Sequence, residues 1–543
     1  MTPPTGALAH RAGQTDASKD TYDAILLGGG HNALVLQAYL GKAGLTTLCL
    51  ERNAVAGGGL TTVERPAGSG HRHNIHSFFH RAVTQMPWYT DLELQRHGAT
   101  YIEPALNVAM LLSDGRSLEW WTDFEPAANS FAALDERDAR TLRQWRDDFL
   151  PIVADILAPE AAAPPQEPAA RRRRLEATPE GRLLLATAEM SPLEFVRREF
   201  RHPAVQAGLL FFNGLREVDL RLKGFGHHIP ALLASVGKAQ MCVGGSARLA
   251  SALVSAVEEA GGRIETAVEL RRIVVEDGRA AGVETADGAF YRATHFVASS
   301  LNPQQTLLEL MDPRALPPCL RSQAEGFQYN LIAPLFGLYL NLRQPPRYSA
   351  AEASPHLNNA LMTIIGLDDV NQFDDIVHAH ERGEIPPPVM WGAAPSTFDP
   401  SQAPDGLHTA FMWEKLPYRL DGDATTWDAV KEQHGQDMLD TWTKYAPGLR
   451  EDVIDSFTLS PLDTYRYLPN MRDGDLLVGA FAHGQVGYDR PFPGAGHYRS
   501  GVDGLYMCGS CCHPGGNITG LPGYNAAQVI LADLGMSPPG SSG

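Results

Sequence analysis

The pattern of apolar and polar residues near the start of the chain predicts a strand, a tight turn, a helix and a second strand. Residues 22–27, YDAILL, form an apolar run of strand length. After a glycine-rich turn, the run LVLQAYLGKAG has apolar side chains at helical spacing, and Gly44 ends the helix. A second apolar run, TTLCLE, ends at Glu51. This order is typical of the first unit of a doubly wound α/β sheet.

The same alternation of strands and helices is predicted in the middle and at the end of the chain. Ser246 is expected to be the N-cap of a helix that runs through Ala260. Strands are expected next, and the apolar run THFVAS reads as a buried strand that extends the sheet. Near the C-terminus, a strand and a helix enclose a glycine-rich turn. The expected strands are 263–268, 270–276, 280–286 and 504–510, and the last helix is 525–535.

The turn after the first strand has the chemistry of a dinucleotide-binding site. It reads G-x-G-x-x-A from Gly28 to Ala33. Gly28 permits the tight turn, Gly30 lets a pyrophosphate approach the backbone, and Ala33 permits close packing of helix and strand. Glu51, which lies 21 residues beyond Gly30, can accept hydrogen bonds from a ribose. Strand, turn, helix and terminal acid together predict a bound dinucleotide on a helix N-terminus.

A second glycine cluster favours FAD over NAD. Arg52 and the glycines 57–59 follow Glu51 closely, and such a loop is not part of the minimal dinucleotide fingerprint. It is the pattern of FAD enzymes similar to amine oxidases and carotenoid desaturases. The C-terminal stretch CCHPGGNITGLPGY is expected to be a second anion cradle at a helix N-terminus.

The whole set of motifs resembles the phytoene desaturase-like family of FAD oxidoreductases. The stretches that carry the resemblance are LLGGGHNALVLQAYL, ERNAVAGGGLTT and CGSCCHPGGNITGLPGYNAA. The family includes carotenoid desaturases, a carotenoid ketolase, retinol saturase and pyridine nucleotide-disulphide oxidoreductase domain-containing protein 2. The resemblance implies FAD contacts at Gly28, Gly30, Ala33, Glu51, Arg52, Gly58, Gly59, Val268, Gly509, Ile518 and Thr519.

We therefore expect an α/β protein with a Rossmann-like FAD-binding domain of the amine oxidase/phytoene desaturase type and a discontinuous α+β substrate domain. The alternating run 336–342 reads as a strand of the substrate domain, and the aromatic residues Trp391 and Trp413 as core. The expected segments are 21–75, 236–305 and 476–535 for FAD, 76–235 and 306–475 for the substrate, a disordered tail 1–20 and a flexible loop 158–174.

Histidines and cysteines are the candidates for further chemistry. The stretch GHRHNIHSFFH invites a metal hypothesis, with His76 and His80 on one helix face, but no carboxylate or cysteine completes a site, so no metal is expected. The candidates near the reacting ring are His73, His76, His483 and His513. Residues 488–490 are secondary candidates. Three cysteines at 508, 511 and 512 are interpreted as small packing residues, with a thiol beside the flavin as the alternative.

Length, charge and composition limit the classes of partner and the cellular location that we expect. With 543 residues, more than one domain is expected, and a net charge of -18 argues against nucleic acid. The six cysteines show no framework spacing, the start of the chain is polar, and no run is long enough to span a bilayer, so a cytoplasmic protein is expected. Residues 193–212 mix arginines with aromatics, which leaves peripheral membrane contact open beside a packed helix pair. The oligomeric state, including a homo-oligomer, is left open.

The leading hypothesis is an FAD-dependent dehydrogenase or desaturase that removes hydride from a largely apolar, polyene or isoprenoid substrate to flavin N5. The electron acceptor, oxygen or a quinone, is undetermined. The alternatives are an amine or other small-molecule oxidase, a carotenoid ketolase, a redox-neutral isomerase, and a flavin-bearing interaction protein with little turnover.

Overall fold

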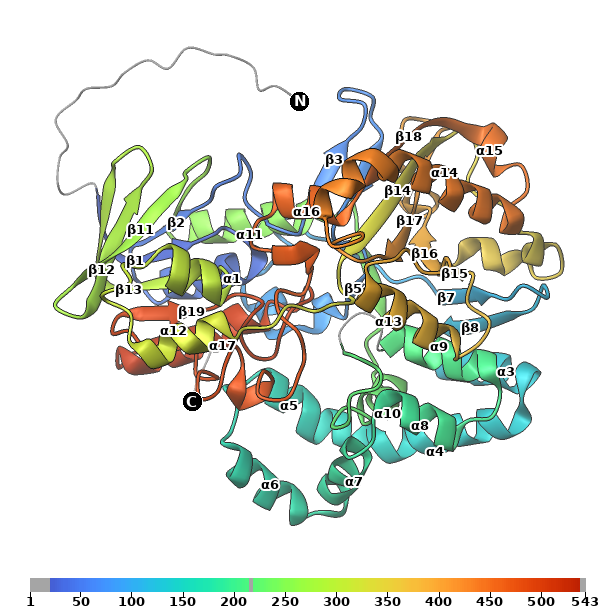
Figure 1. Cartoon of the computed structure of the whole chain (residues 1–543), viewed down its shortest axis with the longest axis horizontal. Coiled ribbons are helices and arrows are strands. Elements are labelled where there is room, and N and C mark those ends of the chain that lie inside the picture. The colour runs from blue at the N-terminus through green and yellow to red at the C-terminus, as the bar shows by residue number, and fades with distance from the viewer. Residues whose placement is uncertain (1–19, 214–217, 538–543) are drawn as a thin grey trace.

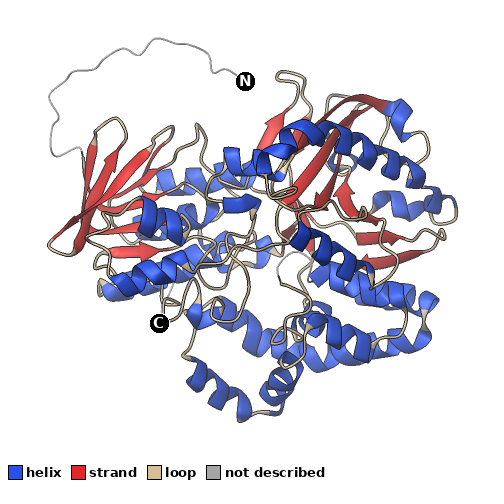
Figure 2. Ribbon diagram, in the orientation of Figure 1, coloured by secondary structure: helices blue, strands red, loops and turns tan. Residues whose placement is uncertain are grey.

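The protein is built around two seven-stranded sheets that lie next to each other, with a helical region against the second (Figures 1 and 2). The computed structural model describes residues 20–213 and 218–537. The predicted tail therefore lies, except for Asp20, outside the described residues. Among the helices of these two ranges, none has both the length and the apolar character needed to cross a bilayer.

The first sheet is the predicted Rossmann-like sheet. Its central strands are parallel, and residues 24–27 of the first strand are fully buried, as expected where helices cover both faces. The strand order is β10 (Arg263–Glu265), β2 (Thr47–Leu50), β1 (Thr21–Leu27), β13 (Phe290–Ser299), β12 (Arg279–Thr285) and β11 (Leu270–Glu276), and β19 (Leu505–Met507) pairs with β13. The α/β fold prediction is confirmed.

Three helices pack together beside this sheet: α1 (His31–Lys42), α11 (Ala247–Glu259) and α17 (Leu521–Asp533). The contact between α1 and α17 is close, because a Cβ added at Gly523 would lie 1.9 Å from the carbonyl oxygen of Asn32. This packing joins the two ends of the sequence. It sets the N-terminal glycine turn beside the C-terminal one.

The second sheet is mixed and carries the expected strand 336–342. Its strand order is β18 (Val453–Leu459), β14 (Leu335–Leu342), β17 (His408–Lys415), β16 (Met390–Ala393), β15 (Met362–Ile365), β7 (Leu106–Leu111) and β8 (Ser117–Trp121). Smaller sheets pair β3 (Thr62–Glu64) with β4 (Arg72–Asn74), and β5 (His80–Arg81) with β9 (Ala239–Cys242) and β6 (Tyr101–Ile102). Strands from two distant segments thus build one sheet.

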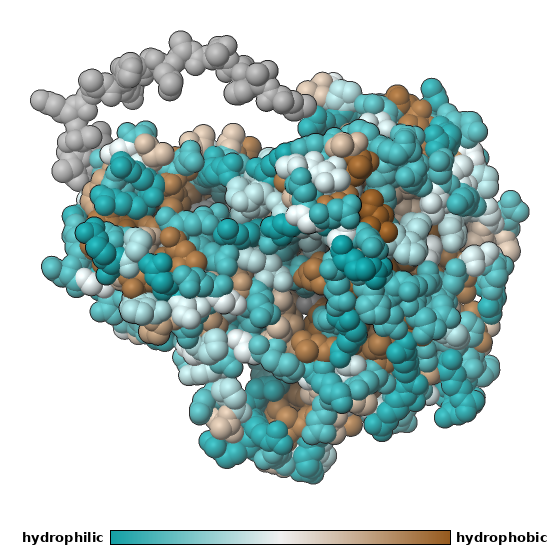
Figure 3. Space-filling model, viewed as in Figure 1, coloured by the Kyte–Doolittle hydropathy of each residue, from teal (hydrophilic) through white to brown (hydrophobic). Residues whose placement is uncertain are grey.

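The lower part of the molecule in Figure 1 is helical. Its helices are α3 (Phe124–Leu134), α4 (Glu136–Ile152), α5 (Ala158–Ala161), α6 (Pro168–Glu176), α7 (Pro179–Ala188), α8 (Pro192–Glu199), α9 (Pro203–Asn213) and α10 (His228–Ala234). Near the second sheet lie α13 (Gln372–Arg382), α14 (Trp427–Tyr445), α15 (Leu449–Asp452) and α16 (Pro461–Tyr467), whereas α2 (Pro87–Asp91) and α12 (Pro318–Glu325) pack into the core of the first sheet. Residues 193–212 fall on α8 and α9, which contact each other. Figure 3 shows a mainly hydrophilic face with apolar side chains grouped in the hollow between the sheet regions.

The predicted loop 158–174 is wrong. It contains α5 and most of α6, and the basic run at its end is helical. Glu160 of α5 is linked to α6, because its carboxylate accepts hydrogen bonds from Arg171, at 2.9 Å, and from Arg174. The arginines are therefore paired within the segment. Proline and alanine content alone gave no sign of this pairing.

Three local expectations also differ from the structure. Helix α17 begins at Leu521, four residues earlier than 525. Ser246 precedes α11 but does not cap it, because its hydroxyl donates to the carbonyl oxygen of Ser77. His76 and His80 share no helix, since the chain there is extended and His80 begins β5.

Candidate functional site

The two N-terminal glycine clusters meet at the end of β1. Gly28 has a φ of +82°, and its N–H donates to the carbonyl oxygen of Leu50 at 2.9 Å. The N–H of Gly57 donates to the carbonyl oxygen of Gly29 at 2.8 Å. Residues of the second cluster therefore close over the first turn.

The N-terminus of α1 is open toward the space beside these clusters. Gly30 precedes the helix with a φ of −71°, and no side chain caps it. A Cβ built on Gly30 would meet no atom within 4 Å. Free N–H groups and the positive end of the helix dipole attract an anion. The turn therefore offers both the room and the polarity that a phosphate needs.

Glu51 holds this turn from the neighbouring strand. It is 7% exposed, and its Oε2 accepts a hydrogen bond from the N–H of Gly29 at 2.7 Å. Its Oε1 accepts from the N–H of Asn53 at 2.7 Å. Its backbone carbonyl accepts from the N–H of Val268 at 2.9 Å. The carboxylate is thereby fixed at the carboxyl end of the sheet, where ligands of open α/β sheets bind.

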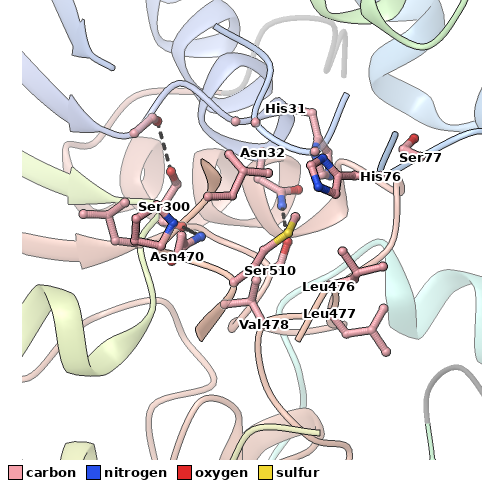
Figure 4. A pocket seen from close by; sticks show the side chains of 18 of the residues that line it. His31, Asn32, His76, Ser77, Ser300, Asn470, Leu476, Leu477, Val478 and Ser510 are labelled. Carbon is pink, nitrogen blue, oxygen red and sulfur yellow. Dashed lines mark hydrogen bonds between the residues drawn. The ribbon is translucent and has the colours of Figure 1, made fainter. Parts of the chain in front are cut away.

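The C-terminal motif completes the same site. Nε2 of His31 lies 3.2 Å from the carbonyl oxygen of Asn517 and donates to it. Nδ2 of Asn32 donates to Oγ of Ser510 at 3.1 Å, as Figure 4 shows. The Oδ1 atom of Asn32 is buried and has no hydrogen-bond partner among the described residues. Both glycine-rich turns thus face one space, with an acceptor atom left for a ligand.

That space is a cavity of about 400 Å³ between the first sheet and the second. One end has Glu51 and Arg52, the middle has the glycine turns, and the other end has the aromatic wall of Phe78, Phe79, Trp391 and Trp413. Figure 4 shows His76, Leu476, Leu477 and Val478 among the side chains around the cavity. Its size is that of an ordinary cofactor or ligand site.

Not every sequence-predicted residue lines this cavity. Those that do are Gly28, Gly30, Glu51, Arg52, Gly58, Gly59, His76 and Ile518. The other predicted residues do not line the cavity and belong to the structure around it: Ala33, Val268, Gly509 and Thr519. Ala33 is fully buried, a Cβ at Gly509 would lie 2.2 Å from the carbonyl oxygen of Ser300, and the carbonyl of Thr519 accepts from Nε1 of Trp88 at 2.6 Å.

His76 is the one candidate catalytic histidine on the cavity wall. Its Nε2 lies 3.3 Å from Oγ1 of Thr464, and its ring stacks on Tyr467 with 5.9 Å between centroids. Its Nδ1 has no partner within the described part of the chain. Burial lowers the pKa of His76 to about 4, so the ring is neutral near pH 7. It can accept a hydrogen bond but is a weak base.

The other three candidate histidines lie elsewhere. His73 bonds Oδ1 of Asn341 at 2.8 Å and packs against Phe457. His513 donates from Nε2 to the carbonyl oxygen of Glu160 at 3.0 Å. His483 lies against Phe225, with 6.0 Å between the ring centroids. These contacts assign the three residues to packing between segments rather than to the cavity wall.

The cysteine cluster has the environment of packing residues. Cys508, Cys511 and Cys512 are buried, and the Sγ atoms of Cys511 and Cys512 are 3.9 Å apart. Burial raises the pKa values of Cys508 and Cys512 well above the usual thiol range, which makes them poor nucleophiles. Arg490 is fully buried beside them and donates to backbone carbonyls, including that of Ser510 at 3.2 Å. In the described ranges, no group of three or more metal-ligating side chains could hold an ion.

The far wall of the cavity was not predicted from the sequence. Trp391 and Trp413 are core residues, as expected, but they also line the cavity. Lys415, at the end of β17, donates to the carbonyl oxygen of Ala333 at 2.8 Å and lies 5.7 Å from the ring centroid of Trp391. These residues come from strands far along the chain and carry no motif. His31 and Asn32 also line the cavity and were not predicted. Their position directly after the glycines of the first turn is a sequence signal that could have identified them.

The donor set and the open space fit a phosphate-bridged dinucleotide. Gly30 leaves room, the uncapped α1 supplies N–H groups, and Glu51 provides a fixed carboxylate. The fold alone does not require a glycine at position 30, since a Cβ there would meet nothing.

The chain is similar over nearly its whole length to two curated proteins. It is 28% identical over 535 residues to one of the subunits of limonene dehydrogenase from Castellaniella defragrans, covering 95% of both chains. It is 27% identical over 569 residues to pyridine nucleotide-disulfide oxidoreductase domain-containing protein 2 of Rattus norvegicus, covering 96% of both. A neurosporene-forming phytoene desaturase of Cereibacter sphaeroides is 24% identical over 312 residues, 55% of this chain and 54% of its own.

Solved structures agree on the fold. Wild-type putrescine oxidase bound to putrescine matches with a TM-score of 0.60 and 14% identity, covering 95% of this chain and 99% of its own. No protein-family model matches the chain. The relatives confirm the resemblance to the phytoene desaturase-like proteins, and the protein is an oxidoreductase with dehydrogenase and desaturase homologues.

Proposed function

We propose that the protein is an FAD-dependent dehydrogenase or desaturase that oxidises a largely apolar small molecule. The observation that carries the proposal is the cavity in which a dinucleotide cradle at one end continues into an apolar, aromatic wall at the other. The names of the relatives support it, because limonene and the carotenoids are apolar isoprenoids.

Residues at the sheet end of the cavity would hold the nucleotide half of FAD. Glu51 would bind the ribose, and the N-terminus of α1 with Gly30 and Gly58 would receive the pyrophosphate. Asn517 and Ile518, before α17, would lie along the remaining part of the cofactor. When bound, the flavin supplies the hydride acceptor. The boundaries predicted for the FAD-binding and substrate segments stay part of this proposal.

The apolar end would bind the substrate and exclude water. Phe79 and Trp413 pack edge to face with 5.9 Å between centroids, and Trp391 and Trp413 with 6.2 Å. Such a wall stabilises an apolar ligand through the area it removes from water. Neutral His76 offers one nitrogen to a proton or hydroxyl of the substrate. A polar group placed against this aromatic wall would give up hydration with few partners.

The test is anaerobic mixing of the purified, flavin-loaded protein with apolar isoprenoids such as limonene, and with amines such as putrescine as the comparison. Loss of the oxidised-flavin absorbance with the isoprenoid alone is the expected result. Reduction by the amine alone would instead favour an amine oxidase. A protein that neither contains FAD nor takes it up would overturn the proposal.

A further inference from the structure

A second, smaller cavity of about 60 Å³ adjoins the apolar end of the first. Phe79 lines both cavities. The walls are also in contact further out, because Phe211 of the second cavity packs against Trp391 of the first with 5.5 Å between ring centroids. An aromatic partition therefore separates the two spaces. A ligand that reaches both spaces would have to displace this partition.

The second cavity differs from the first in its charge. Its apolar lining includes Val108, Trp120 and Met362, but two cationic side chains, Arg81 and Lys238, also line it. Arg81 pairs with Ala239 in the β5–β9 ladder, which sets it beside Lys238 at the start of the neighbouring strand. Lys238 is half-buried, whereas Arg81 is also exposed to solvent.

Lys238 is held in place by short contacts. Its Nζ donates to the carbonyl oxygen of Ser235 at 2.6 Å and lies 5.9 Å from the ring centroid of Trp120. Burial, with the nearby cations Arg81 and Arg146, lowers its pKa to about 8, and Glu103 opposes that shift. The ammonium group is still largely charged near pH 7. An ammonium group has three N–H donors, so Nζ can donate to a further acceptor besides the carbonyl oxygen of Ser235.

The size of the second cavity argues against a separate ligand. A single water needs roughly 10–15 Å³ by this kind of measure, so 60 Å³ holds a group of a few atoms. A carboxylate with a short piece of chain is such a group. A positively charged pocket at the end of a long apolar cavity suits the head of an amphiphile.

We propose that the substrate is an apolar chain that ends in a carboxylate, with the chain against the aromatic wall of the first cavity and the carboxylate at Lys238 and Arg81. This inference rests on the proposed function, because it assigns the substrate class of the same site. In this arrangement the apolar chain of the substrate contains the reacting atoms, and the carboxylate determines the orientation of the substrate. Lys238 is thus a specificity-determining residue at a distance from the cofactor cradle.

The experiment compares binding of parinaric acid, a fluorescent polyene carboxylic acid, with binding of its methyl ester to the protein as isolated. The acid is expected to bind about tenfold more tightly than the ester, the size of one charge-assisted contact. Lys238→Met should remove that preference by weakening only the acid. Lys238→Arg should restore it, which a misfolded variant would not do. Lys223→Met, at an exposed lysine paired with Glu194, is the matched control.

Three outcomes would overturn the inference. The first is equal affinity of the wild type for acid and ester. The second is a Lys238→Met variant that keeps the preference for the acid. The third is displacement of the probe by dodecyl phosphate at lower concentration than by dodecanoate, which would make the head group a phosphate.

Flavin content and flavin reduction are measured on the same samples. A protein without flavin contradicts the proposed function, whatever the probe shows. A protein whose flavin is reduced by isoprenoids but which treats acid and ester alike contradicts only the carboxylate assignment.

Discussion

Gly30 shows how a single residue can be needed by a ligand and not by the fold. Its backbone has a φ that any residue adopts, and a Cβ there would meet nothing within 4 Å. Gly509 is the opposite case, because a Cβ there would collide with the carbonyl oxygen of Ser300 at 2.2 Å. The sequence assigned both glycines to FAD. The structure gives only Gly30 a place on the cavity wall.

Replacing Gly30 with valine is therefore expected to abolish FAD binding and leave the protein folded. The branched side chain would occupy the space in which a pyrophosphate approaches the helix N-terminus. Flavin absorbance after gel filtration measures the loss, and circular dichroism measures the fold. Gly30→Ala is the graded control and should retain part of the flavin. A folded Gly30→Val protein with full flavin content would contradict the cofactor site.

At the scale of elements, helix α5 and the turn after it are tied to the FAD-side helix α17. Nδ2 of Asn525 donates to the carbonyl oxygens of Ala161 at 2.9 Å and of Ala163 at 3.3 Å. Nε2 of His497 donates to the carbonyl of Pro165 at 2.9 Å. The partners lie more than 300 residues apart in the sequence. Local composition therefore predicted a flexible loop where the fold has an ordered crossing segment.

Asn525→Ala should release this segment. Two partly buried carbonyl oxygens lose their donor, which is expected to lower the free energy of unfolding by about 1 kcal/mol. Limited proteolysis should then cut between residues 162 and 167 sooner than in the wild type. Gln433→Ala, at an exposed position of α14, is the control for a change of side chain alone. Equal cleavage of Asn525→Ala and the wild type would show that the segment is held by other contacts.

At the scale of the whole molecule, buried neutral histidines link stability to pH. Burial lowers the pKa of His31, His73, His76, His380 and His513 to about 4 and that of His80 to about 3. In the unfolded chain these rings titrate near the ordinary value of about 6.5. Below that pH the unfolded chain binds protons that the folded protein does not.

The free energy of unfolding should therefore fall as the pH decreases from about 6.5 to about 4, and should be nearly constant above that window. Urea midpoints at several pH values measure it. His380→Gln should flatten the decline, because His380 is buried on α13 and donates from Nδ1 to the carbonyl oxygen of Ile376 at 2.8 Å. His378→Gln, exposed on the same helix, is the matched control and should leave the slope unchanged. A slope that His380→Gln does not change would assign the decline to other groups.

The sequence by itself determined the first strand, glycine turn and helix of the α/β sheet and the position of Glu51 beside them. These features depend on contacts within about 30 residues, so spacing and side-chain type were enough to predict them. The glycine-rich turn before the C-terminal helix followed from the same kind of local pattern, although that helix begins four residues earlier than predicted.

Only the tertiary structure decided the far half of the cavity. Trp391, Trp413 and Lys415 come from neighbouring strands of the second sheet, and Arg81 and Lys238 from a strand pair between distant segments. Their side chains have ordinary roles in local sequence, as core aromatics or exposed cations. They become cavity walls because strand pairing over long separations brings them together, and no local pattern encodes which strands pair.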